Sequence, residues 1–115
     1  MSESKLEFDT GLRADELDRQ RPCFVETPWG AMALFVVGAD VVCTQAFCPH
    51  LEGPLFQGSV ADGCVTCPWH YWRFDLRTGR RVGVFGIPFG SERLTRCPVT
   101  RGERGTLVLQ PPRGD

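Results

Sequence analysis

Residues 46–79 read AFCPHLEGPLFQGSVADGCVTCPWHYWRFDLRTG and hold two short motifs of different spacing. The first contains Cys48 and His50, and the second contains Cys67 and His70, with sixteen residues between the two motifs. Each motif offers one thiolate and one imidazole near the end of a predicted strand. The Asp62-Gly63 pair between them is a strong hairpin signal, so the two motifs can face each other and enclose a small cofactor.

The rest of the chain consists of short segments rich in Val, Phe, Leu and Thr, separated by turn signals. Strands are predicted at residues 23–27, 31–37, 41–46, 60–61, 64–67, 72–76, 94–99 and 106–110. Long loops are expected at 47–59 and 83–92, a helical turn at 14–19 and a frayed tail at 111–115. This spacing of strands predicts an all-β fold, an antiparallel β sandwich or barrel.

Composition narrows the class of protein. A chain of 115 residues is the size of one domain, and a net charge of −1 gives no reason to expect nucleic acid as a partner. The longest apolar run, 31–39, is too short to span a membrane, and the charged N-terminus has no export signal. We therefore expect a cytoplasmic protein with no membrane contact, in which six cysteines indicate metal before disulfides.

The segments CPHL (48–51), CPWH (67–70) and FDLRTG (74–79) resemble the two cluster-binding boxes of Rieske proteins. The resemblance implies one [2Fe–2S] cluster per chain, with Cys48 and Cys67 on the buried iron and His50 and His70 on the outer iron. Residues 86–90 resemble the family's third, proline-containing loop over the cluster. A single Rieske domain over 1–115 follows, with a cluster-binding subdomain at about 46–90.

The sequence departs from the respiratory members of the family at several positions. Those members have one extra cysteine in each box, joined as a disulfide, where this chain has Gly53 and Trp69. They also place Ser and Tyr hydroxyls near the cluster, where this chain has Trp72 and Phe74. Tyr71 stands where the family commonly has a small residue, and its ring is expected to crowd or shield the cluster mouth.

Other interpretations of the cysteines remain open. The four ligands could hold zinc, although zinc fingers order their ligands Cys-Cys-His-His, and a Cys48–Cys67 disulfide is a further alternative. The remaining cysteines are most simply small buried hydrophobes, and Cys64 could also form a Cys-x-x-Cys redox pair with Cys67. These remaining cysteines are Cys23, Cys43, Cys64 and Cys97.

Aromatic and basic residues divide into core and surface candidates. Trp29, Trp72, Phe35 and Phe74 are predicted core residues, whereas Trp69 and Tyr71 are candidates for the cluster rim. Residues 73–104 hold eight arginines against three acids, which makes this stretch a candidate docking face or an ordinary solvated surface.

The resemblance predicts an electron-transfer component that is not catalytic alone. Oxygenases of the family add a second iron site with two further histidines and a carboxylate, but this sequence has two histidines in all. The favoured function is a ferredoxin that passes electrons from a flavin reductase to a terminal oxygenase. The alternatives are the small subunit of an NADH-dependent nitrite reductase and a zinc-stabilised, non-redox binding module.

Because Trp72 and Phe74 supply no hydroxyl donor to the cluster sulfurs, we predict a midpoint potential near −150 mV, the bottom of the range known for Rieske centres. A dye-mediated redox titration of the purified protein measures it. A midpoint above about +100 mV would contradict the hydrogen-bond argument.

Overall fold

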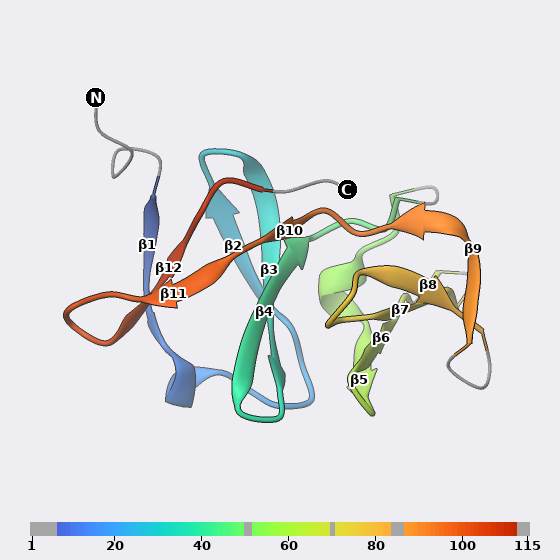
Figure 1. The fold of residues 1–115 in the computed structure, drawn as a ribbon, viewed down its shortest axis with the longest axis horizontal. Helices are drawn as coiled ribbons and strands as arrows, with labels where there is room; N and C mark the ends of the chain where they lie inside the picture. The colour runs from blue at the N-terminus through green and yellow to red at the C-terminus, as the bar shows by residue number, and fades with distance from the viewer. Residues whose placement is uncertain (1–6, 50–51, 70, 84–86, 113–115) are drawn as a thin grey trace.

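Three antiparallel sheets make up the computed structural model, which describes residues 7–49, 52–69, 71–83 and 87–112 (Figure 1). The terminal sheet has the order β1 (Phe8–Arg13), β12 (Thr106–Leu109), β11 (Val99–Arg101). The middle sheet has the order β10 (Arg96–Cys97), β4 (Asp40–Gln45), β3 (Gly30–Val37), β2 (Cys23–Thr27). The third sheet has the order β5 (Ser59–Ala61), β6 (Cys64–Thr66), β7 (Arg73–Asp75), β8 (Arg80–Val82), β9 (Pro88–Arg93).

The predicted all-β, antiparallel fold is confirmed. The described helices are two three-residue 3-10 turns, η2 (Ala14–Glu16) and η3 (Leu55–Gln57). Within the described ranges, then, no helix has the length and apolar character that crossing a membrane requires.

Strand β3 is buried on both of its faces. Ala33, Phe35 and Val37 pack in one core with residues of the third sheet, including Phe74. Met32 and Leu34 point to the opposite face and pack in a second core with Leu107 and Leu109 of the terminal sheet. A strand covered on both sides reads as a continuous apolar run rather than an alternating one, which explains the uninterrupted apolar stretch in this part of the sequence.

The Asp62-Gly63 hairpin forms as the sequence predicts. Both residues have positive φ, 54° for Asp62 and 75° for Gly63, which is the requirement of a type I′ turn. The flanking strands β5 and β6 pair with Val60 opposite Val65. This turn fixes the register of the strand that leads into the second cysteine motif.

The predicted strand at 94–99 is wrong as a single element. It splits at Pro98 into β10, which pairs with β4, and β11, which pairs with β12. Proline has no N–H to give to a ladder, so the chain leaves the middle sheet there and enters the terminal sheet. Strand β1 was not predicted, although Phe8 and Leu12 pack against the second core.

The predicted loop at 83–92 is also wrong in part, because Pro88–Arg93 forms β9 and pairs with β8. Proline is compatible with the first residue of an edge strand, which is the place that Pro88 takes. The helical turn expected at 14–19 is limited to η2.

Gly58 is the close-contact point between η3 and the third sheet. Its N–H donates to the carbonyl of Leu55 at 2.9 Å and so ends the 3-10 turn. A Cβ at this position would collide with the backbone carbonyl oxygen of Thr66, the residue before Cys67. Glycine therefore lets the segment after the first motif lie directly against the strand that carries the second.

We predict that Gly58→Ala destabilises the fold by about 2 kcal/mol, because backbone atoms must move to admit the methyl group. Urea unfolding followed by circular dichroism measures the change. The exposed neighbour provides a control, since Ser59→Ala should leave the free energy of unfolding within about 0.5 kcal/mol. Equal effects of the two substitutions would disprove the contact.

Candidate metal centre

The two cysteine motifs lie on loops with the same backbone hydrogen bond. The N–H of Cys48 donates to the carbonyl of Gly53 at 2.7 Å, and the N–H of Cys67 donates to the carbonyl of Trp72 at 2.8 Å. In each loop the acceptor is the fifth residue after the cysteine. The two loops are thus closed in the same way, although their histidines stand at different positions.

The backbone conformations repeat as well. Glu52 has φ 55° and Tyr71 has φ 58°, and each is the fourth residue after its cysteine. A left-handed conformation costs a non-glycine residue on the order of 1 kcal/mol. Strain of this kind persists where the surrounding structure fixes the chain, and it is often found at functional sites.

Both thiols of these loops are buried. Cys48 is 1% exposed and Cys67 is 0% exposed, and both belong to the core that contains Leu55 and Phe74. None of the six cysteines, all of which the structure describes, forms a disulfide. The alternative of a Cys48–Cys67 disulfide is therefore not supported, and the loops offer two buried sulfur donors.

His50 and His70 lie outside the described residues, so their predicted place beside the thiols stays a prediction. Their described neighbours in the chain are solvent-exposed, namely Pro49, Glu52, Trp69 and Tyr71. The thiols thus lie at the inner side of the loops, and the nearest described residues before and after each histidine lie at the surface.

Gly53 and Trp69 are in direct contact. A Cβ on Gly53 would lie 2.9 Å from the Cys67 Sγ and 3.0 Å from the Trp69 Cβ. These are the positions where respiratory members of the resembled family have a disulfide, and a disulfide needs two Cβ atoms about 4 Å apart. In this chain the Trp69 side chain packs against Gly53, which has no side chain. This contact joins the two loops without a covalent bond.

Tyr71 and Trp69 are the expected rim residues, and both are exposed, Tyr71 by 76% and Trp69 by 51%. Phe47 and Ile87 are exposed large apolar residues on neighbouring segments. The described part of the third loop closes through the Gly83 N–H, which donates to the Ile87 carbonyl at 2.8 Å. Residues 84–86 lie outside the described residues, so the role predicted for 86–90 stays a prediction.

The aromatic residues predicted as core divide into two groups. Phe35 and Phe74 are fully buried, while Trp29 and Trp72 are partly buried and pack against the cores. The Arg81 guanidinium lies 3.3 Å from the centre of the Trp72 ring, and it also pairs with Glu92. Trp72, whose carbonyl closes the second loop, is thereby held by a cation–π contact.

The remaining cysteines are separate from the loops. Cys64 is the first residue of the extended strand β6 and Cys67 directly follows that strand. A spacing of three residues in extended chain puts their Cα atoms about 10 Å from each other. A disulfide needs less than about 7 Å, so the Cys-x-x-Cys interpretation is wrong. Burial raises the pKa of the Cys64 thiol, which suits a small buried side chain.

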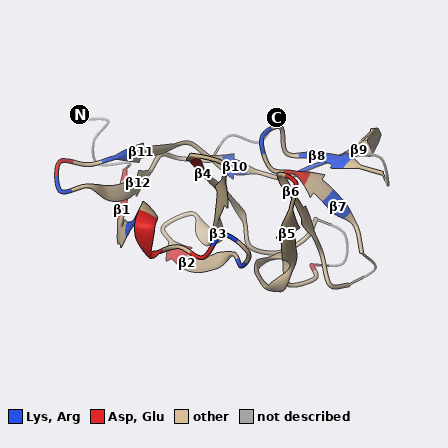
Figure 2. Ribbon diagram, turned by 90° about the horizontal axis from the view of Figure 1, so that it is seen from below, with Lys and Arg blue, Asp and Glu red and all other residues tan. Residues whose placement is uncertain are grey.

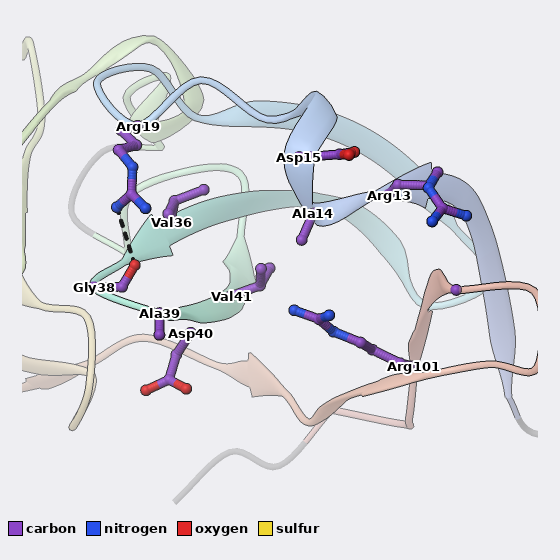
Figure 3. A pocket seen from close by; sticks show the side chains of 11 residues that line it. Arg13, Ala14, Asp15, Arg19, Val36, Gly38, Ala39, Asp40, Val41 and Arg101 are labelled. Atoms are coloured by element: carbon purple, nitrogen blue, oxygen red, sulfur yellow. Dashed lines mark hydrogen bonds between the residues drawn. The ribbon is translucent and has the colours of Figure 1, made fainter.

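The arginines of 73–104 do not form one surface. Figure 2 shows basic residues along β7, β8 and β9, with Arg80 opposite Arg93 in the ladder. Arg101 belongs instead to the terminal sheet, where it points into a cavity of about 330 Å³ beside η2 (Figure 3). In the same cavity Arg19 donates to the carbonyl of Gly38 at 3.0 Å. None of the six cysteines, all of which are described, lines this cavity, so it offers no thiolate to a metal.

The comparison with protein families identifies the domain. A model of the Rieske [2Fe-2S] domain matches residues 11–88. The chain belongs to this Rieske family. A [2Fe–2S] cluster is the cofactor of the domain, and the zinc interpretation falls with this assignment.

Among curated relatives, the anthranilate 1,2-dioxygenase ferredoxin subunit of Burkholderia cepacia is 34% identical over 65 residues, 56% of this chain and 60% of that protein. The aminopyrrolnitrin oxygenase of Pseudomonas fluorescens is 40% identical over 68 residues, 59% of this chain and 18% of that protein. The chain thus spans three fifths or less of the length of these two relatives, and they include both ferredoxins and oxygenases.

Solved structures share the whole fold of this Rieske domain. The ferredoxin of carbazole 1,9a-dioxygenase from Nocardioides aromaticivorans has a TM-score of 0.74 at 22% identity, covering 93% of this chain and 98% of that chain. A putative nitrite reductase small subunit has a TM-score of 0.75 at 19% identity, covering 91% and 98%. These similarities concern the fold alone.

The described residues fit the cofactor of the family. Two buried thiols at the ends of matched loops supply the soft donors that iron–sulfur clusters take from proteins. In this chain, where Trp69 faces position 53, a Cβ on Gly53 would lie within 2.9 Å of the Cys67 sulfur. Cys48 and Cys67 are therefore the residues that would hold the cluster on its cysteine side.

We predict that Gly53→Ala lowers the iron content and the visible absorption of the purified protein at least severalfold, because the new methyl group displaces the Cys67 sulfur. Iron analysis per chain measures the effect. Gly102→Ala is the matched control, since Gly102 lies outside the loops and its Cβ would meet nothing closer than 3.2 Å. Full iron content in Gly53→Ala would show that the contact is not restrictive.

Proposed function

We propose that this Rieske domain is a one-electron carrier whose single [2Fe–2S] cluster is held by Cys48, His50, Cys67 and His70. In this proposal the two cysteines bind the inner iron and the two histidines bind the outer iron. The observation that carries it is the pair of equally closed loops, each with a buried thiol behind exposed neighbours.

The choice of ligands supports electron transfer. When bound, the cluster supplies a one-electron couple, whose net charge of zero in the oxidised state becomes −1 on reduction when two ligands are neutral imidazoles. The chain's own residues keep water from the thiols through the core around Phe74 and Leu55. The exposed Trp69 and Tyr71 flank His70 in sequence and give a partner apolar surface beside it.

These 115 residues do not by themselves supply the second iron site of an oxygenase. A mononuclear iron site takes two histidines and a carboxylate, and the 115 residues contain two histidines, both assigned here to the cluster. We therefore assign the carrier role, with a flavin-dependent reductase as electron donor and a terminal oxygenase as acceptor. The relatives named as ferredoxin components of dioxygenases support this assignment.

The small subunit of a nitrite reductase remains the second candidate function. It is supported by the shared fold of a putative member at 19% identity. The ferredoxin of carbazole 1,9a-dioxygenase shares the fold at a similar 22% identity, so the fold does not separate the two candidates. A carrier binds its partners briefly, while a subunit keeps one permanent interface.

We predict that the purified protein is red-brown, contains two irons per chain and gives, after dithionite reduction, an electron paramagnetic resonance signal of low average g. His50→Cys and His70→Cys should each lower the midpoint potential, because each adds a negative charge to the cluster. A colourless protein, or an unchanged potential in both variants, would refute the ligand assignment.

The carrier role has a separate test. Mixed with a flavin-dependent reductase and NADH, the protein should be reduced, and an oxygenase component with its aromatic substrate should then reoxidise it and release product. Co-purification of the chain as a stable complex with a large sirohaem enzyme would instead establish the subunit function.

A further inference from the structure

Two cysteines and a methionine lie together in the core between the middle and terminal sheets. Cys43 of β4 stands directly opposite Cys97 of β10 in the antiparallel ladder. Both side chains are buried, at 1% and 3% exposure, and the Cys97 Sγ lies 4.0 Å from the Sδ of Met32. Leu34 separates this pair from Cys23 in the same row across the sheet.

The ladder places the two cysteines within disulfide range. Directly opposed residues of an antiparallel pair have Cα atoms about 4.5–5.5 Å apart, and disulfides span about 4.4–6.8 Å. Strand β10 has two residues and a partner on one side only, so it can adjust to the shorter sulfur–sulfur distance of a covalent bond.

The pair is reachable by a small reagent. A cavity of about 320 Å³ borders β4 and β10, and Cys43, Cys97, Arg96 and Pro98 are among the residues that line it. A water molecule takes about 30 Å³ of liquid volume, so the cavity admits a molecule of the size of hydrogen peroxide. The burial of the pair therefore does not close it to such an oxidant.

We infer that Cys43 and Cys97 form a redox-active thiol pair, which a hydroperoxide converts to a cross-strand disulfide with Cys97 as the attacking sulfur. This site is distinct from the cluster loops and goes beyond the proposed electron-carrier function.

The two cysteines have different roles. The interaction with the Cys43 thiol lowers the pKa of Cys97, while the interaction with Cys97 and burial raise the pKa of Cys43. The thiolate is the nucleophilic form of cysteine, so Cys97 attacks first and Cys43 resolves.

The reaction balances with the hydroperoxide as oxidant. The Cys97 thiolate attacks one peroxide oxygen, the O–O bond breaks, and the second oxygen takes the thiol proton and leaves as water or an alcohol. The Cys43 sulfur then attacks the resulting sulfenic acid, the S–O bond breaks, and water leaves with the Cys43 proton. Two thiols and one hydroperoxide thus give one disulfide, one water and one further water or alcohol.

The test uses the whole protein with its cluster. It is treated with an equimolar amount of hydrogen peroxide, its remaining thiols are blocked with N-ethylmaleimide in acid, and peptic peptides are mapped by mass spectrometry. We expect a Cys43–Cys97 linked peptide that dithiothreitol removes, while Cys23 and Cys64 stay as alkylated thiols. Unlinked Cys43 and Cys97, or equal linkage among all four cysteines, would overturn the inference.

Two variants test the roles. In Cys43→Ser, dimedone should trap a sulfenic acid on Cys97, whereas Cys97→Ser should leave Cys43 unlabelled under the same conditions. Labelling of Cys43 in Cys97→Ser, without labelling of Cys97 in Cys43→Ser, would refute the assignment of the attacking sulfur. If either variant fails to fold, the linked peptide of the unmodified chain still decides whether the pair is redox-active.

Discussion

The hydrogen bond from a cysteine N–H to the carbonyl five residues later is the constraint on which the centre depends. It occurs once in each loop, at Cys48 and at Cys67, and it turns the chain back on itself so that the cysteine side chain stays in the core. Each closure requires a left-handed residue, Glu52 or Tyr71, at a cost on the order of 1 kcal/mol. The packing of Leu55 and Phe74 behind the loops offsets that cost.

The same constraint explains why the third sheet needs β3 behind it. The strands of the third sheet that frame the second loop have three residues each, too few to be stable without a covered face. Ala33, Phe35 and Val37 of β3 supply that cover. Because the opposite face of β3 packs on the terminal sheet, the loops are anchored to the whole domain through one strand.

The features that could be predicted from the sequence are those that neighbouring residues determine. The Asp62-Gly63 turn and the strand at 23–27 follow from neighbouring residues, and the structure confirms both. Strand β9 was read as loop because its Pro88 and Gly90 are turn residues in isolation. The break at Pro98 was missed since it depends on which sheet has a free edge for Val99, a question of long-range pairing.

In the candidate site, too, the local motifs could be predicted from the sequence and the long-range contacts could not. Two local motifs predict four ligands, which stay a prediction, and the structure shows that two of the four residues, Cys48 and Cys67, are buried in matched loops. The sequence marked Gly53 and Trp69 as departures from the respiratory pattern. It did not show that they touch, because they are sixteen residues apart and meet only when the two loops face each other. That contact explains sterically why position 53 is a glycine.

Burial by itself does not separate the two kinds of cysteine in this chain, because Cys48, Cys67, Cys43 and Cys97 are all 3% exposed or less. The backbone separates them. Cys48 and Cys67 each begin a loop that closes on itself, whereas a strand ladder holds Cys43 opposite Cys97. The two pairs also belong to different cores, on opposite faces of the middle sheet. Strand β3 lies between those cores, so the proposed disulfide of Cys43 and Cys97 is separated in space from the proposed cluster ligands.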